Sequence, residues 1–339
     1  MRSVPDVMRP VIRSAGATLL ILACAASYLV VGAQAPLALV STAWPPFTNA
    51  PGHPRFALEL VEAAFGRIGV TAKTTIVPAA QFTSSLLDPG NDGSAAAWKD
   101  PDRERLLIFS QPYLENRLVL VGRHGVDVAA KALADLKGKS VAIVEGYSYG
   151  DSVEGAGPIF VRSASEEASL ATLLAGGVEY ALMDDLVVHY IVNNYPKEAG
   201  TRLQIGSTPL VRRELFLVLR RTRPDAESII TRFNAQLRGL IADGTYHRLL
   251  HVDWIRADIN GDGVPEYVPR SNRPGPAEPQ RIYALFSPQE LTAKEPTKPG
   301  FYVGGNIYRD WASVPESYKS STQAPDARRS TASIFKFTW

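Results

Sequence analysis

The stretch from Trp98 to Tyr113 contains the side chain whose chemistry is easiest to infer, that of Arg103. A guanidinium stays charged at physiological pH and presents a planar fork of donors that fits a carboxylate in bidentate fashion. In a cleft, Arg103 would therefore hold a small anion. The alternative is a solvated arginine that pairs with its acidic neighbours Asp100, Asp102 and Glu104.

Two further segments could complete a site for a small charged molecule. A glycine turn at Glu145–Gly150 precedes an expected helix start, where free backbone N–H groups can bind a carboxylate. Ser148 in this turn is equally compatible with an ordinary helix N-cap. The expected strand 178–184 ends in Asp184, with Asp185 next to it. In open parallel sheets this strand end faces the ligand crevice, although Asp184 could instead cap the following helix.

Alternating strands and helices are expected to position these side chains. An apolar strand-like segment at 37–41 and an alternating one at 71–77 flank a helical pattern at 56–68, which implies a parallel sheet with a right-handed crossover. Further apolar runs predict strands at 117–122, 141–144, 178–184 and 214–219. A long amphipathic helix follows Pro224 and ends at Gly244. The alternation predicts an α/β fold.

Composition narrows the class of protein. The chain has 339 residues, 45% of them hydrophobic and 21% charged, which suits one large or two ordinary globular domains. Its net charge of +2 lies in residues 1–35, which carry three arginines and one aspartate, so the body has no charge excess that would attract nucleic acid. The single cysteine, Cys24, also lies in this leader, and we expect no disulfide in the mature chain.

Residues 1–35 are typical of an export signal. A basic start precedes the uncharged apolar segment 15–33, and Ala33-Gln34-Ala35 has the small residues of a cleavage site. The alternatives are a lipoprotein anchored at Cys24 and an uncleaved membrane anchor. All three place the body outside the cytoplasm, and we expect a periplasmic protein.

The segment 258–266, DINGDGVPE, has oxygen ligands at alternating positions and could bind Ca²⁺. The expected ligands are Asp258, Asn260, Asp262 and Glu266. A full EF-hand is excluded because Pro269 occupies the position of its last ligand, and a plain Asn-Gly/Asp-Gly turn is the alternative. The Pro-rich residues 270–339 show no long periodic pattern, and we assign them no fold.

These motifs resemble those of the type 2 periplasmic solute-binding proteins, specifically the polar amino-acid receptors of ABC importers, which are the bacterial extracellular solute-binding proteins of family 3. The family pattern T-P-E-R, a short apolar run and F-S-x-P-Y corresponds to residues 100–103 and 109–113. An L-K-G-K segment at 136–139 and the acid, alanine and aspartate of 179–184 follow in the family's order. The resemblance covers about residues 37–255.

The resemblance implies a two-lobed periplasmic binding protein type 2 fold, with two parallel or mixed sheets joined by two crossing strands. The implied domains are a signal peptide at 1–35, lobe 1 at 36–121 and 217–255, lobe 2 at 122–216, a calcium-like loop at 256–269 and a Pro-rich extension at 270–339.

It also implies the roles of site residues. In the family the matching arginine holds the substrate's α-carboxylate and the matching aspartate takes its α-ammonium, roles that fall on Arg103 and Asp184. An aromatic residue that covers the ligand corresponds to Trp44. The implied ligand-binding residues are Trp44, Phe47, Trp98, Arg103, Tyr147, Ser148 and Asp184, with Gln81 and Phe82 beside Trp98 in the side-chain pocket.

The implied function is capture of an amino acid or related carboxylate for ABC-type import, by a monomer that needs no cofactor and meets a membrane permease. Ala96 and Trp98 replace residues that are often polar in relatives, and Ser41 replaces an acid, which favours a ligand that is smaller, more aromatic or not an amino acid. An enzyme resembling cyclohexadienyl dehydratase, with Glu145 as its proton-transfer group, is one alternative. A sensor or interaction module is the other.

Overall fold

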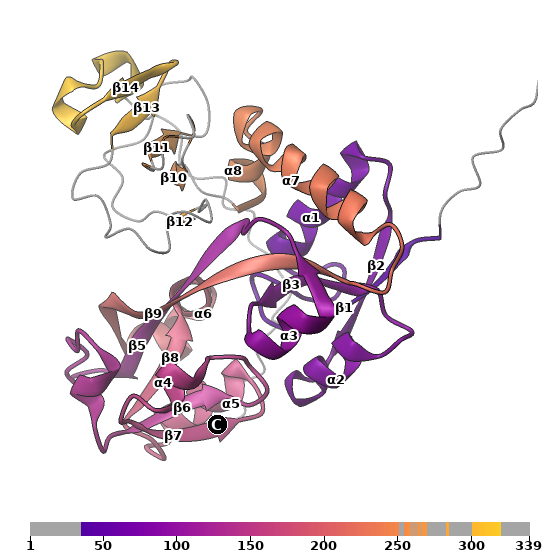
Figure 1. Cartoon of the computed structure of the whole chain (residues 1–339). Helices are drawn as coiled ribbons and strands as arrows, with labels where there is room; N and C mark the ends of the chain where they lie inside the picture. Colours follow the sequence, from indigo (N-terminus) through magenta and orange to yellow (C-terminus); the bar gives the residue numbers. More distant parts are fainter. Residues whose placement is uncertain are drawn as a thin grey trace, which may run out of the picture. The chain divides into compact units, whose positions relative to one another are not determined.

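The computed structural model describes residues 35–250, 254–257, 259, 262, 264, 266–269 and 300–319, and the backbone of 283–284 (Figure 1). The expected signal peptide lies outside these residues, except for Ala35. Within the described part of the chain, no helix combines the length and apolar character needed to cross a bilayer.

The first lobe is built on a parallel strand–helix–strand unit. β1 (Leu37–Thr42) pairs in parallel with β2 (Ala72–Val77), and α1 (Phe56–Arg67) connects them. The apolar residues of α1 recur at helical spacing, and one face is buried, as its sequence predicts. The buried residues are Phe56, Ala57, Leu58, Leu60, Val61, Ala64 and Phe65.

The rest of the first lobe carries the Arg103 segment. It comprises α2 (Phe82–Leu87), the fully buried strand β3 (Gly93–Trp98), α3 (Pro101–Leu106) and β4 (Leu107–Phe109). Pro101 occupies the first turn of α3, where its missing N–H and fixed φ suit a helix start. The C-terminal helices α7 (Ala226–Ala242) and α8 (Thr245–Leu250) complete this lobe. Phe233 of α7 packs on Phe65 of α1, with ring centroids 6.1 Å apart.

Two long strands, β5 (Leu114–Arg123) and β9 (Leu203–Arg220), connect the lobes. They pair antiparallel, and β9 also pairs with β3 and β4. β5 also pairs with β8 (Tyr180–Asp184) of the second lobe, whose other strands are β6 (Ser140–Val144) and β7 (Ile159–Ser163). The hydrogen-bonded order β2-β1-β3-β9-β5-β8-β6-β7 therefore runs through both lobes. These are the two crossing strands that the sequence predicts.

The second lobe repeats the alternation. It comprises β6 (Ser140–Val144), α4 (Asp151–Glu154), β7 (Ile159–Ser163), α5 (Glu166–Leu174), β8 (Tyr180–Asp184) and α6 (Asp185–Asn194). β6 pairs in parallel with both β7 and β8. The carboxyl ends of β6 and β8 carry the Glu145–Gly150 turn and Asp184.

A second sheet, which the sequence did not predict, follows the lobes. Its strands are β10 (Trp254–Ala257), β11 (Glu266–Pro269), β12 (Tyr283–Ala284), β13 (Phe301–Val303) and β14 (Asn306–Tyr308). Trp254, Phe301, Val303 and Val314 form a small core of their own. The expected calcium-like loop is the connection between β10 and β11, which pair antiparallel.

Candidate functional site

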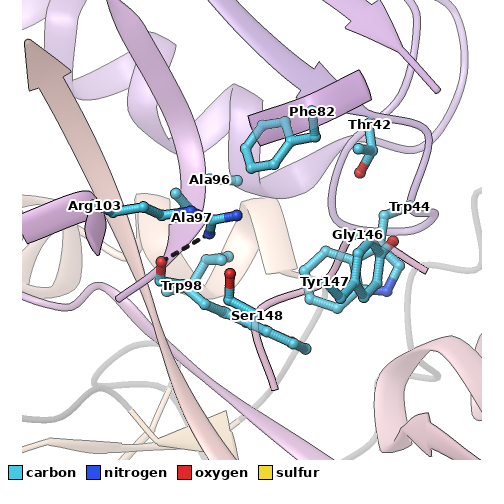
Figure 2. Close-up of a pocket in the computed structure, with 11 residues that line it drawn as sticks. Thr42, Trp44, Phe82, Ala96, Ala97, Trp98, Arg103, Gly146, Tyr147 and Ser148 are labelled. Carbon is cyan, nitrogen blue, oxygen red and sulfur yellow. Dashed lines mark hydrogen bonds between the residues drawn. The ribbon is translucent and has the colours of Figure 1, made fainter. Parts of the chain in front are cut away.

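Arg103 lies on the buried face of α3 and is only 3% exposed, which is rare for an arginine. Its Nη1 donates to the Trp98 carbonyl oxygen at 3.1 Å, and its Nη2 donates to Thr83 Oγ1 at 3.0 Å. Figure 2 shows the side chain reaching into the pocket beside Ala97. Each terminal nitrogen carries two N–H groups and makes one hydrogen bond to the described residues, so each retains a donor for a ligand.

Asp100 is the N-cap of α3, and its Oδ1 accepts the N–H groups of Asp102 and Arg103, each at 3.0 Å. Its Oδ2 accepts a 2.8 Å hydrogen bond from Ser148 Oγ of the second lobe and lies 3.1 Å from Arg103 Nε. Burial raises the pKa of Asp100, but these hydrogen bonds and the Arg103 charge outweigh it and lower the pKa. Asp100 thus engages two of the side chains that the sequence assigns to the ligand.

Three aromatic rings from the two lobes meet over the pocket. Trp44 and Trp98 of the first lobe and Tyr147 of the second lie mutually edge to face, with centroids 5.6 to 5.7 Å apart. Burial raises the pKa of Tyr147 well above its usual value, so its hydroxyl stays protonated. The ring of Phe47 lies behind Trp44, at 4.4 Å between centroids, and is fully buried.

These residues enclose a pocket with about 350 Å³ of empty space, part of it open to solvent (Figure 2). The lining residues are Thr42, Trp44, Phe82, Ala96, Ala97, Trp98, Arg103, Gly146, Tyr147, Ser148 and Leu215. The structure therefore brings most of the predicted ligand residues together. Phe47, Gln81 and Asp184 are not among the lining residues.

Asp184, the expected partner of a ligand ammonium, is 1% exposed and already accepts three hydrogen bonds. Its Oδ1 caps α6 through the Leu186 N–H at 2.8 Å. Its Oδ2 accepts from Asn116 Nδ2 and the Arg117 N–H, both at 3.1 Å. Burial raises the pKa of Asp184 to about 7, although these hydrogen bonds oppose it. The structure shows Asp184 as the cap of α6, which is the alternative role that the sequence left open. Its binding of a ligand ammonium stays a prediction.

Glu166, in the first turn of α5, is a second buried acid and is 5% exposed. Burial, with a smaller contribution from the Asp184 charge, raises its pKa to about 8. The Trp44 indole lies close enough to lower that pKa somewhat, yet Trp44 Nε1 and Glu166 Oε2 make no well-aligned hydrogen bond. Since Trp44 belongs to the first lobe, this carboxyl lies against the interface of the two lobes.

Further contacts hold the lobes against each other. Gly146 of the second lobe has φ +82°, and a Cβ placed there would lie 2.6 Å from the Ala79 carbonyl oxygen of the first lobe, so only glycine fits. Arg213 on β9 donates to the carbonyl oxygens of Lys99 and Ser148, at 2.7 and 2.8 Å. Its guanidinium lies over the Trp98 ring, with Cζ 5.7 Å from the centroid. The described lobes are therefore in their closed arrangement.

With this geometry established, comparison with known families identifies the chain. The family model of the bacterial extracellular solute-binding proteins, family 3, matches residues 38–256. The chain belongs to this family. The match confirms the family that the sequence motifs indicate. It also covers nearly the same residues as that resemblance, which spans about 37–255.

Similar proteins of this class are binding proteins. The ABC transporter arginine-binding protein 1 of Escherichia coli strain K12 is 24% identical over 151 residues, which are 44% of this chain and 60% of that relative. The match thus spans less than two thirds of the relative's length. ArgBP from T. maritima, in a mutant form, has a TM-score of 0.53 and 25% identity, over 64% of this chain and 93% of that one.

Two other solved structures share the fold. The GluR0 ligand-binding core from Nostoc punctiforme, in complex with L-glutamate, has a TM-score of 0.53 and 22% identity, over 63% of this chain and 97% of that one. A histidine kinase sensor domain with similarity to periplasmic binding proteins has a TM-score of 0.55 and 20% identity, over 63% and 94% of the two chains. The type 2 periplasmic binding fold is confirmed.

The residue on which an enzymatic alternative depends does not line the pocket. Glu145 is exposed and is not among the lining residues. The family and the named relatives are binding proteins rather than enzymes.

Sequence reasoning missed three side chains of the site. Asn116 links Trp98 to Asp184, Arg213 contacts both lobes, and Glu166 lies beneath Trp44. For Glu166 the only local signal is its place after the N-cap Ser165, which explains a helix start and nothing more. The other two lie on crossing strands, and their partners are far away in sequence.

The expected calcium ligands are only partly covered by the structure, because Asp258 and Asn260 lie outside the described residues. Asp262 Oδ1 accepts the Val264 N–H at 2.8 Å, and Glu266 Oε2 accepts the Ile259 N–H at 3.2 Å. Among the described residues, no three histidine, cysteine or acidic side chains gather as a metal site. Calcium binding by this loop stays a prediction.

Proposed function

We propose that this protein captures a small carboxylate between its lobes, outside the cytoplasm, and delivers it to the permease of an ABC importer. Amino acids are the first class of ligand to test, because relatives named for arginine and glutamate binding share the fold. The observation that carries the proposal is the buried Arg103 guanidinium, which keeps a donor on each terminal nitrogen beside an aromatic pocket.

The energetics support a carboxylate ligand. A hydrogen bond to a charged group contributes about 1.5–3 kcal/mol net, so a bidentate pair with Arg103 can offset much of the desolvation of an anion. The pocket joins residues of both lobes, and the crossing strands β5 and β9 supply the hinge about which such lobes open and close. Closure over the ligand would bury the ion pair and strengthen it.

The remaining assignments follow from the family and the sequence. A leader-directed periplasmic location fits a family of extracellular solute-binding proteins. We expect a monomer, because a receptor that hands its ligand to a permease needs one cleft and both lobe surfaces.

Calorimetric titration with a panel of amino acids and small organic acids tests the proposal. At least one carboxylate should bind, and Arg103→Lys should weaken it about ten- to hundredfold, because lysine cannot form the bidentate pair. Arg105→Lys is the matched control: Arg105 lies on the same helix, but its side chain is 75% exposed and pairs with Asp102. Absence of binding across the panel, or equal effects of both variants, would refute the assignment.

A further inference from the structure

The walls of the pocket are mostly apolar, and Arg103 and Ser148 form its polar end. Trp44, Trp98 and Tyr147 form three faces, and Phe82, Ala96, Ala97 and Leu215 supply others. The polar lining groups are Arg103, Ser148, Thr42 and the backbone of Gly146. Among the described residues, no acidic side chain lines the pocket.

The acid that could meet a ligand ammonium is shielded from this space. Trp98 Nε1 donates to Asn116 Oδ1 at 2.8 Å, and Asn116 Nδ2 donates to Asp184 Oδ2 at 3.1 Å. The Trp98 indole therefore lies between the pocket and the Asp184 carboxylate. A ligand ammonium could reach Asp184 only by breaking this buried chain.

The charge at the polar end also favours an anion over a zwitterion. Burial and the nearby Arg213 charge lower the pKa of Arg103, whereas Asp100 raises it, so a second positive charge lies beside Arg103. Arg213 is in turn close to the carboxyl groups of Asp100 and Glu214. An α-ammonium next to the ligand carboxylate would face the Arg103 guanidinium and apolar walls. The nearby Asp100 carboxylate does not line the pocket and is already held by Ser148, Arg103 and two backbone N–H groups. A buried charge without a partner is strongly unfavourable.

We propose that the site selects a small monocarboxylate with an apolar or aromatic body and discriminates against an α-ammonium, with Trp98 as the residue that sets this specificity. The inference rests on the proposed function, because it names the ligand class of the same pocket. The carboxylate pairs with Arg103, and the body of the ligand packs against Trp44, Trp98 and Tyr147. An amino-acid receptor would instead need an accessible acid at this position.

Matched ligand pairs test the inference in the unaltered full chain. Hydrocinnamate and phenylalanine differ only in the α-amino group, as do isocaproate and leucine. Calorimetry should give the ligand without the amino group at least about tenfold tighter binding within each pair. Glycine betaine and tert-butylacetate form a third pair, equal in shape but differing in a quaternary ammonium, and the neutral-bodied acid should again bind more tightly.

Replacement of the indole tests the role of Trp98. Trp98→Ser removes the barrier before Asn116 and Asp184, so the preference within each pair should shift by at least about tenfold toward the amino acid. Arg103→Lys should weaken the binding of both members of a pair equally, because both ligands carry the carboxylate.

The outcomes separate the two proposals. Tighter binding of phenylalanine, leucine or betaine than of their partners by the unaltered protein would overturn the selectivity and leave carboxylate capture standing. Binding of neither member in any pair would overturn the selectivity, and only absence of binding across the whole panel would overturn carboxylate capture as well. The pairs measured on the unaltered protein decide the matter even where Trp98→Ser does not fold.

Discussion

The hydroxyl of Ser148 donates a 2.8 Å hydrogen bond to the carboxylate of Asp100, and this bond joins the two lobes across the mouth of the pocket. The same carboxylate oxygen lies 3.1 Å from Arg103 Nε. The protein's own acid thus holds the groups that would otherwise meet the carboxylate of a ligand. Any carboxylate that enters must share Arg103 with Asp100 or displace it.

Asp100→Thr should strengthen carboxylate binding. Threonine keeps the N-cap of α3 but removes the competing negative charge, so Arg103 and Ser148 become available to the ligand. An advantage of about 1 kcal/mol, or roughly fivefold in affinity, is expected by calorimetry. Asp102→Asn serves as the control, because that side chain is 89% exposed and pairs with Arg105 on the surface. Weaker binding by Asp100→Thr would mean that Asp100 assists the ligand.

Gly146→Ala should keep the lobes apart. The added methyl group would lie 2.6 Å from the Ala79 carbonyl oxygen, and φ +82° also disfavours a residue with a side chain. Small-angle X-ray scattering should show a larger radius of gyration than for the unaltered protein, and saturating ligand should not restore the closed value. Gly138→Ala is the control, because its φ is +76° but no atom lies within 4 Å of the added Cβ. Equal scattering curves for the two variants would contradict this role of Gly146.

Glu166→Gln should change how stability depends on pH. The folded protein holds this carboxyl with a pKa of about 8, whereas the ordinary value is 4.5. Between these values only the folded state keeps the proton, so the stabilising contribution is complete below pH 4.5 and is lost as the pH rises toward 8. Glutamine cannot ionise and removes that loss.

Thermal unfolding measured between pH 5 and 8 tests this. The unaltered protein should lose about 3 kcal/mol of stability over this range through Glu166, and the glutamine variant should not. Glu167→Gln removes a charge from the same helical turn at a less buried position and serves as the control. Parallel pH profiles for Glu166→Gln and the unaltered protein would show that the buried carboxyl does not govern this dependence.

Asp184→Asn should lower the stability of the fold more than it lowers the affinity for the ligand. The amide has one oxygen to serve the donors of Asn116, Arg117 and Leu186, so at least one buried donor loses its partner, which costs about 1–3 kcal/mol. Urea unfolding measures this loss of stability. Asp185→Asn is the control, because the neighbouring Asp185 side chain is 21% exposed and pairs with His189. A large loss of affinity without a loss of stability would instead indicate direct contact of Asp184 with the ligand.

The sequence predicted the parts of this molecule whose signals are local. The helical spacing of α1 and α7 and the alternation of strands gave the lobes, and the order of motifs gave the pocket position of Arg103, Tyr147 and Ser148. Such signals are reliable because each depends on residues within one or two turns or strands.

Long-range packing explains what the sequence did not predict. The position of Asp184 at the end of β8 was correct, but its separation from the pocket depends on Trp98 and Asn116, which other segments supply. The pairing of Asp100 with Ser148 exists only when two distant loops meet. The strands of the second sheet have two to four residues, which is too short for periodicity to mark them.

The first strand of that second sheet bears on how the protein should be produced. The family match ends at residue 256, inside β10, whereas the partner strand β11 begins only at Glu266. A recombinant chain trimmed to the match would leave the Trp254 indole without Phe301 and Trp311, and the strand without a neighbour. Bare apolar rings and open strand edges promote aggregation, so a soluble preparation should extend at least through Lys319.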